Sequence, residues 1–260
     1  MLNNNDLSND KSFFKNYDFY IDKRIKYTYN IIEGDMMKVN NPLYKNIGIH
    51  LTSTIFTVDK GTMKVLLIKR NNKPYFGYWA LPGGCLYNNE LVLEGAKREL
   101  KEKTGVSNID LTLFKIFDKI DRSPIKRMIC LAFIGVLDID KVELLNKTEK
   151  ASDINWVDIK NIPELAYDGN EVLEAAIIKL KELIQSTKIL KNLFPKEFTL
   201  PELQSVYESI LNINIDRRNF RKKMINSELI IDINKTINYN GKKPAKLYKF
   251  NDKCNNKSIF

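Results

Sequence analysis

The sequence predicts an α/β fold, a sandwich of strands and helices, followed by a small helix-turn-helix domain. Strand-like apolar segments surround a helix with clustered glutamates, and capped helices replace the strands after about residue 184. Residues 185–260 hold 15 Lys+Arg and 7 Asp+Glu, a net charge of +8, against +2 for residues 1–184. We therefore expect an N-terminal extension (1–46), an α/β domain (47–184) and a basic C-terminal domain (185–260).

Composition narrows the class of protein. Of the 260 residues, 43% are hydrophobic, enough for real cores, but no apolar run has the length of a membrane span. We recognise no secretory leader, and the three dispersed cysteines suggest reduced thiols. We therefore expect a cytoplasmic protein without a membrane partner. The only histidine, His50, argues against a histidine-based zinc site and a serine–histidine hydrolase.

The α/β domain reads as a series of strands with two helices. One helix is expected over about 90–104, where Gly105 ends it, and another over 170–184, where apolar residues recur at helical spacing. The expected strands are 47–58, 63–70, 111–117, 126–137 and 154–157, with a turn at 59–61.

The C-terminal domain begins with strong helix signals. Thr199 and Glu202 form a capping box at the start of one helix, and Asp216 caps a second helix after a turn at 212–215. Strands over 229–233 and 247–250 would form a β-wing with its tip at 238–244. Two helices, a tight turn and a wing are the parts of a winged helix-turn-helix.

The second helix and the wing are rich in cations that suit double-stranded DNA. The helix would enter the major groove, and the wing would lie on the adjacent backbone. The alternative is a solvated basic face, and RNA is less favoured because no aromatic stacking platform is evident. The residues expected to contact DNA are Arg217, Arg218, Arg221, Lys222, Lys242, Lys243 and Lys246.

The stretch Gly84–Val106 reads GCLYNNELVLEGAKRELKEKTGV. It resembles the Nudix box, G-x5-E-x7-R-E-U-x-E-E-x-G-U with U a bulky aliphatic residue, at every defined position except one. The resemblance implies hydrolysis of nucleoside diphosphate derivatives with Mg²⁺ as the cofactor. It implies Glu99 and Arg98 as catalytic residues if the site is active. Glu99, Glu102 and, more weakly, Gly84 would be the metal ligands, with Glu90 in support.

The one departure from the box is Lys103, which stands where the last clustered glutamate is expected. Glu99 and Lys103 are four residues apart, so they share a helix face and can form an ion pair. We expect an inward Lys103 to neutralise Glu99 and to repel an incoming cation, which would weaken or abolish hydrolysis. The alternative is an outward Lys103, with two carboxylates sufficient to hold the metal.

Three C-terminal segments, FTLPELQ from Phe198, RNFRKK from Arg218 and PAKLYKF from Pro244, resemble the Nudix-related transcriptional regulators. This family combines a Nudix α/β/α sandwich with a winged helix-turn-helix domain. The resemblance implies a homodimer that binds DNA and senses a nucleotide-type small molecule, of which ADP-ribose is the best known. Arg70, Arg122 and Arg127 are candidate ligand-binding cations, although each could be ordinary surface charge. The alternative function is a Mg²⁺-dependent Nudix hydrolase of ADP-ribose or a related nucleotide, with an accessory basic domain.

Overall fold

The computed structural model describes residues 46–186, 188–194, 197–238 and 244–252. The expected N-terminal extension lies outside these ranges except for its last residue, as do the predicted wing residues Lys242 and Lys243. Residues 47–260 form one compact unit. Within the described part of the chain, no helix is both long enough and apolar enough to cross a membrane.

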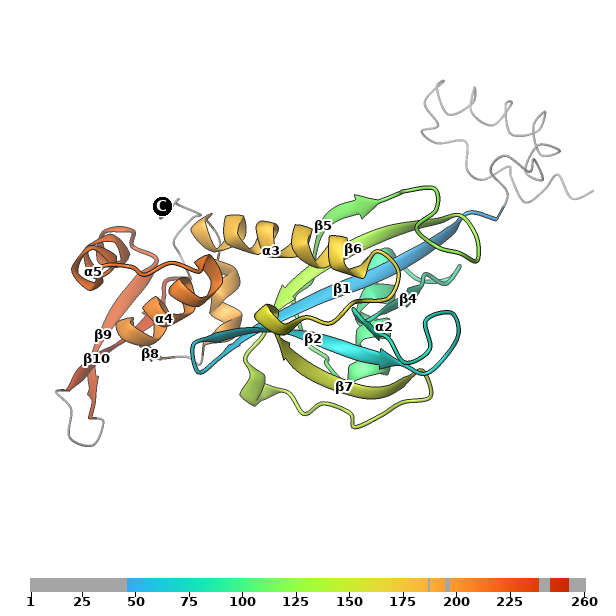
Figure 1. The fold of residues 1–260 in the computed structure, drawn as a ribbon. Coiled ribbons are helices and arrows are strands. Elements are labelled where there is room, and N and C mark those ends of the chain that lie inside the picture. Colours follow the sequence, from blue (N-terminus) through green and yellow to red (C-terminus); the bar gives the residue numbers. More distant parts are fainter. Residues whose placement is uncertain (1–45, 187, 195–196, 239–243, 253–260) are drawn as a thin grey trace, which may run out of the picture. The chain divides into compact units, whose positions relative to one another are not determined.

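One mixed sheet organises the first part of this unit (Figure 1). Its main order is β3-β2-β1-β6-β5, while β4 pairs with β1 and β7 pairs with β2. The β1–β6 pair is parallel and the other pairs are antiparallel. The strands are β1 (Gly48–Asp59), β2 (Thr62–Arg70), β3 (Trp79–Ala80), β4 (Gly83–Cys85), β5 (Thr112–Phe117), β6 (Met128–Val136) and β7 (Ala151–Asp158).

Helices cover both faces of this sheet. Helix α2 (Val92–Thr104) packs Ala96 and Leu100 against Leu51 and Ile55 of the central strand β1. Helix α3 (Gly169–Ser186) packs against the opposite face (Figure 1). The predicted α/β/α sandwich is therefore confirmed. Helix α2 ends as expected, because Gly105 has a left-handed φ of 83°.

The C-terminal elements form a winged helix, as predicted. A 3-10 helix, η4 (Lys188–Leu193), precedes β8 (Phe198–Thr199), α4 (Leu200–Leu211), α5 (Arg217–Asn226), β9 (Ile230–Ile237) and β10 (Ala245–Phe250). The Thr199–Glu202 capping box begins α4, and Asp216 caps α5 by accepting a hydrogen bond from the Asn219 amide at 2.9 Å. Strand β8 was not expected: Phe198 and Thr199 pair with β10, so one short segment both closes the small sheet and starts α4.

The two parts share one hydrophobic core. Helix α3 reaches the winged helix at its C-terminal end, where the Tyr207 hydroxyl of α4 donates to the Ile184 carbonyl at 3.1 Å. Both residues are buried in a cluster that also contains Phe56 of β1 and Phe198 of β8. A displacement of α3 would therefore act directly on the position of α4.

Candidate functional site

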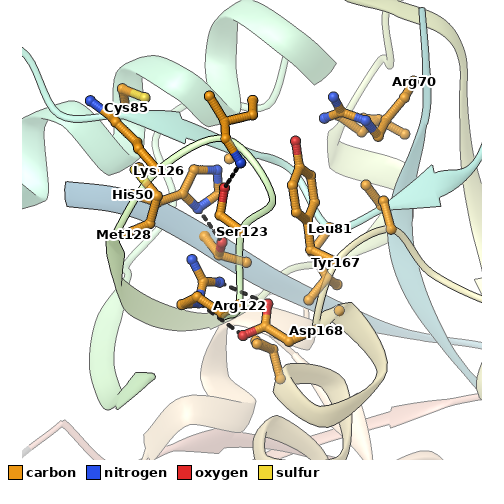
Figure 2. A pocket seen from close by; sticks show the side chains of 18 residues that line it. His50, Arg70, Leu81, Cys85, Arg122, Ser123, Lys126, Met128, Tyr167 and Asp168 are labelled. Carbon is orange, nitrogen blue, oxygen red and sulfur yellow. Dashed lines mark hydrogen bonds and ion pairs between the residues drawn. The ribbon is translucent and has the colours of Figure 1, made fainter. Parts of the chain in front are cut away.

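A cavity of about 320 Å³ is lined by residues from the start of α3, the loop before β6 and the start of β1 (Figure 2). Its polar lining includes His50, Arg70, Arg122, Tyr167 and Asp168. These residues come from distant parts of the chain, and the fold brings them to one place. The volume lies within the usual range for small-molecule sites.

Arg122 is in the cavity wall, but its guanidinium already has a partner. It donates two hydrogen bonds to Asp168, from Nε to Oδ2 at 2.9 Å and from Nη2 to Oδ1 at 2.7 Å (Figure 2). The side chains are only 6% and 12% exposed. Such a two-pronged arrangement is the geometry in which arginine binds carboxylates and phosphates most strongly.

The other two candidate arginines differ from each other. Arg70 lines the cavity, donates from Nη2 to the Pro74 carbonyl at 2.8 Å, and lies 5.1 Å from the Tyr167 ring centroid. Arg127 is not part of the cavity lining, because it donates to the carbonyls of Asp118 and Lys119 instead. The structure thus brings Arg70 and Arg122 together, and it directs Arg127 to its own loop.

His50 lies in a part of the cavity that disfavours its protonated form. Burial first, and then the charges of Lys103, Arg122 and Arg70, lower the pKa of His50 to about 3. The Cys130 thiol lies 3.4 Å from Thr52 Oγ1, to which it donates, and Thr52 Oγ1 lies 3.0 Å from His50 Nδ1. A neutral His50 whose Nδ1 accepts from the Thr52 hydroxyl fits this series of hydrogen bonds. The positive charges of Lys103, Arg122 and Arg70 near His50 favour an anionic ligand in this cavity.

Arg98 braces the Nudix-box loop against α2. It donates to Glu90 Oε1 and to Glu99 Oε1, each at 2.7 Å, and to the Cys85 carbonyl at 3.1 Å. Glu102 is more distant, 3.4 Å from Arg98, and its side chain is 49% exposed. Arg98 therefore holds the loop and helix together, while Glu102 lies at the edge of the site.

Lys103 points inward, so the alternative of an outward Lys103 is wrong. Its side chain is buried, with Nζ 3.0 Å from Glu99 Oε2, and Nζ also donates to the Gly83 carbonyl. Burial alone would raise the pKa of Glu99, but Lys103 and Arg98 outweigh burial and hold that pKa below its usual value. Burial lowers the pKa of Lys103, and Glu99 offsets this only partly.

These contacts do not fit a magnesium ion. Both oxygens of Glu99 face cations, and an ammonium already lies between Glu99 and the Gly83 carbonyl. Gly84 packs directly against the Glu99 carboxylate, since a Cβ there would lie 2.1 Å from Glu99 Oε2. Among the described residues, no cluster of three His, Cys, Asp or Glu side chains could hold a metal. The ligands expected from the box, Glu99, Glu102 and Gly84, therefore do not form a metal site around Lys103.

Helix α5 presents an exposed basic surface. Phe220 and Met224 are buried beneath it, with the Phe220 ring 5.5 Å from that of Tyr207 in α4. Lys246 of the wing is also exposed, although its ammonium lies 2.7 Å from Asp232 Oδ2. The apolar side of α5 thus anchors the helix while its cations face solvent. The exposed cations are Arg217, Arg218, Arg221, Lys222 and Lys223.

Comparison with known proteins matches both parts of the chain. A family model described as "NUDIX domain" matches residues 49–180, and one described as "NrtR DNA-binding winged helix domain" matches residues 191–250. The "ADPR responsive transcriptional repressor NtrR" of Acinetobacter baylyi is 32% identical over 200 residues, which cover 75% of this chain and 79% of that protein. The chain belongs to the Nudix-related transcriptional regulators.

A solved member of the Nudix-related transcriptional regulators has the same architecture. Shewanella oneidensis NrtR, in a crystal structure with a 27mer DNA, is 25% identical with a TM-score of 0.65, covering 78% of this chain and 93% of that one. An "ADP-ribose pyrophosphatase" of Methanocaldococcus jannaschii is 37% identical over 111 residues, which cover 43% of this chain and 64% of that protein.

Sequence reasoning did not propose His50, Tyr167 or Asp168 as site residues of this regulator, although all three line the cavity. Tyr167 and Asp168 lie immediately before α3, and nothing in their spacing distinguishes them from other loop residues. The available signal was their place before the expected helix at 170–184, since residues at a helix N-terminus often line anion-binding sites. That signal alone does not select the cavity side of the sheet.

Proposed function

We propose that this chain is a DNA-binding transcriptional regulator, a repressor by its similarity to the Acinetobacter relative, whose Nudix domain binds ADP-ribose as an effector. The observation that carries the choice of sensor over enzyme is the position of Lys103. Its ammonium lies between Glu99 and the Gly83 carbonyl, where a hydrolase would need a divalent cation. We propose that the domain binds the nucleotide without cleaving it.

The cavity supports ADP-ribose as the ligand class. Its diphosphate carries negative charge, and Arg70 and Arg122 lie in the cavity wall. Tyr167, whose ring lies beneath the Arg70 guanidinium, lines the same cavity and adds aromatic surface for a base or ribose. Two relatives carry ADP-ribose in their names, one as a responsive repressor and one as a pyrophosphatase.

Helix α5 supports double-stranded DNA as the macromolecular partner. We propose that α5 enters the major groove, with Arg217, Arg218, Arg221 and Lys222 on bases and phosphates. Lys246 would exchange Asp232 for a phosphate oxygen, and Lys242 and Lys243 would extend the same wing. We further propose a homodimer, because paired winged helices read paired half-sites, and a boundary between the two domains near residues 184–185.

The test is fluorescence anisotropy of the full chain on DNA from upstream of its own gene, with and without ADP-ribose, over a salt series. We expect specific binding that ADP-ribose changes and that survives moderate salt. Chromatography of the nucleotide after incubation should show intact ADP-ribose. Weak binding that salt abolishes on every sequence, with or without the nucleotide, would sink the proposal.

A second candidate function is Mg²⁺-dependent hydrolysis of ADP-ribose. It is favoured by the retained Arg98 and Glu99, which keep the loop geometry of the box. Brisk, EDTA-sensitive turnover by the unmodified chain would support it. Turnover that appears only after Lys103→Glu would instead support the sensor function, because it would identify Lys103 as the missing ligand position.

A further inference from the structure

The Arg122–Asp168 ion pair joins the candidate ligand cavity to α3. Arg122 belongs to the loop before β6, whereas Asp168 immediately precedes the first residue of α3. Both side chains are almost fully buried, and both line the cavity (Figure 2). The pair therefore ties the start of α3 to the wall against which a ligand would bind.

The far end of α3 contacts the DNA-binding part. The Ile184 carbonyl, in the last turn of α3, accepts the hydrogen bond from Tyr207 of α4. The Tyr207 ring in turn packs edge-on against Phe220 of α5, the buried residue beneath the basic surface. Asp168, α3, Tyr207 and Phe220 thus form an unbroken series of contacts from the cavity to α5.

We propose that the diphosphate of the effector competes with Asp168 for Arg122, and that loss of this ion pair releases the start of α3 and changes DNA affinity. The inference rests on the proposed function. A guanidinium binds carboxylate and phosphate with the same two-pronged geometry. Asp168 occupies the Nε–Nη2 edge of Arg122, so a phosphate that takes this edge must displace the carboxylate. The ligand then binds the released state better than the paired state, which is the differential affinity that any allosteric effector requires.

The chain contains a matched control for this pair. Lys119 and Glu171 also connect the loop before β6 to the first turn of α3, by an ion pair between side chains that are 63% and 41% exposed. Neither residue lines the cavity. If any ion pair at the start of α3 affected DNA binding through helix stability alone, removal of this one would act in the same way.

The experiment compares Asp168→Asn, Arg122→Gln and the control Glu171→Gln in the full chain. DNA affinity is measured by anisotropy without ligand, and ADP-ribose affinity by calorimetry. Both cavity variants should shift DNA affinity at least threefold, in the direction in which ADP-ribose shifts the unmodified chain. The two variants should differ in their affinity for ADP-ribose. Asp168→Asn should bind it severalfold more tightly than the unmodified chain, because Arg122 no longer holds a carboxylate. Arg122→Gln should bind it at least tenfold more weakly. Glu171→Gln should behave as the unmodified chain.

The opposite behaviour of the two cavity variants towards the nucleotide separates competition from misfolding, since damage to the fold would weaken both. Asp168→Asn with unchanged DNA affinity and unchanged ADP-ribose affinity would overturn the inference. An unmodified chain that ignores ADP-ribose would overturn the proposed effector instead. In that case, the coupling through α3 would also be overturned if both cavity variants bound DNA as tightly as the unmodified chain. It would be supported if both variants changed their DNA affinity in the same direction.

Discussion

Lys103→Glu replaces the ammonium beside Glu99 with a carboxylate, and the structure sets the size of the expected loss of stability. At 3.0 Å, the attraction between Lys103 and Glu99 is about 5 kcal/mol at an effective dielectric constant of about 20, before desolvation is subtracted. Removal of one partner from a buried pair costs about 3–5 kcal/mol. The variant also places a second carboxylate beside Glu99, so without a cation we expect the melting temperature to fall by roughly 10 °C.

Magnesium should reverse much of this loss. In the variant, two carboxylates and the Gly83 carbonyl present oxygen atoms to one position, which is the ligand set a hard divalent cation prefers. A metal that binds only the folded state contributes about 2.7 kcal/mol at a hundredfold excess over its Kd. The unmodified chain should gain almost nothing, because its ammonium is already in place.

The assay is thermal unfolding of the full chain in EDTA and in excess Mg²⁺. Lys103→Met is the matched control, because it removes the ammonium without adding a ligand. It should be destabilised in both buffers alike. The reasoning about Lys103 is refuted if Lys103→Glu melts with the unmodified chain in EDTA, or if Mg²⁺ stabilises all three proteins equally.

Because the folded pKa of His50 is about 3 and lies below the unfolded value, the unfolded state binds the extra proton between about pH 6.5 and 3. The free energy of unfolding should therefore decrease as the pH is lowered through this window, by up to about 1.4 kcal/mol per pH unit. Urea unfolding of His50→Asn should show a smaller decrease over the same window. Arg221→Gln should weaken DNA binding and, if Arg221 contacts one phosphate, reduce the slope of log K against log salt by about 0.9. The control is Lys160→Gln, at an exposed site in the 3-10 helix η3 (Ile159–Asn161), which should leave the affinity and the slope unchanged. Thr199→Ala removes the α4 cap and should cost about 1 kcal/mol in chemical unfolding, and an unchanged midpoint would show that Glu202 alone suffices.

The sequence alone predicted the features that depend on neighbours along the chain. Capping residues and Gly105 mark helix ends because they satisfy backbone groups within one turn. The Lys103–Glu99 pair followed from a spacing of four residues on one helix, and the structure has that pair. The two-part fold followed from periodicity, since strands and helices bury their apolar residues at different intervals.

Only the tertiary structure decided which distant side chains meet. Arg122 and Asp168 are 46 residues apart, and their pairing depends on the fold placing the loop before β6 beside the start of α3. Arg70 and Arg127 look alike in sequence, yet one lines the cavity and the other donates to its own loop. Long-range contacts of this kind are set by the packing of whole elements against a shared core, and no local spacing in the chain encodes them.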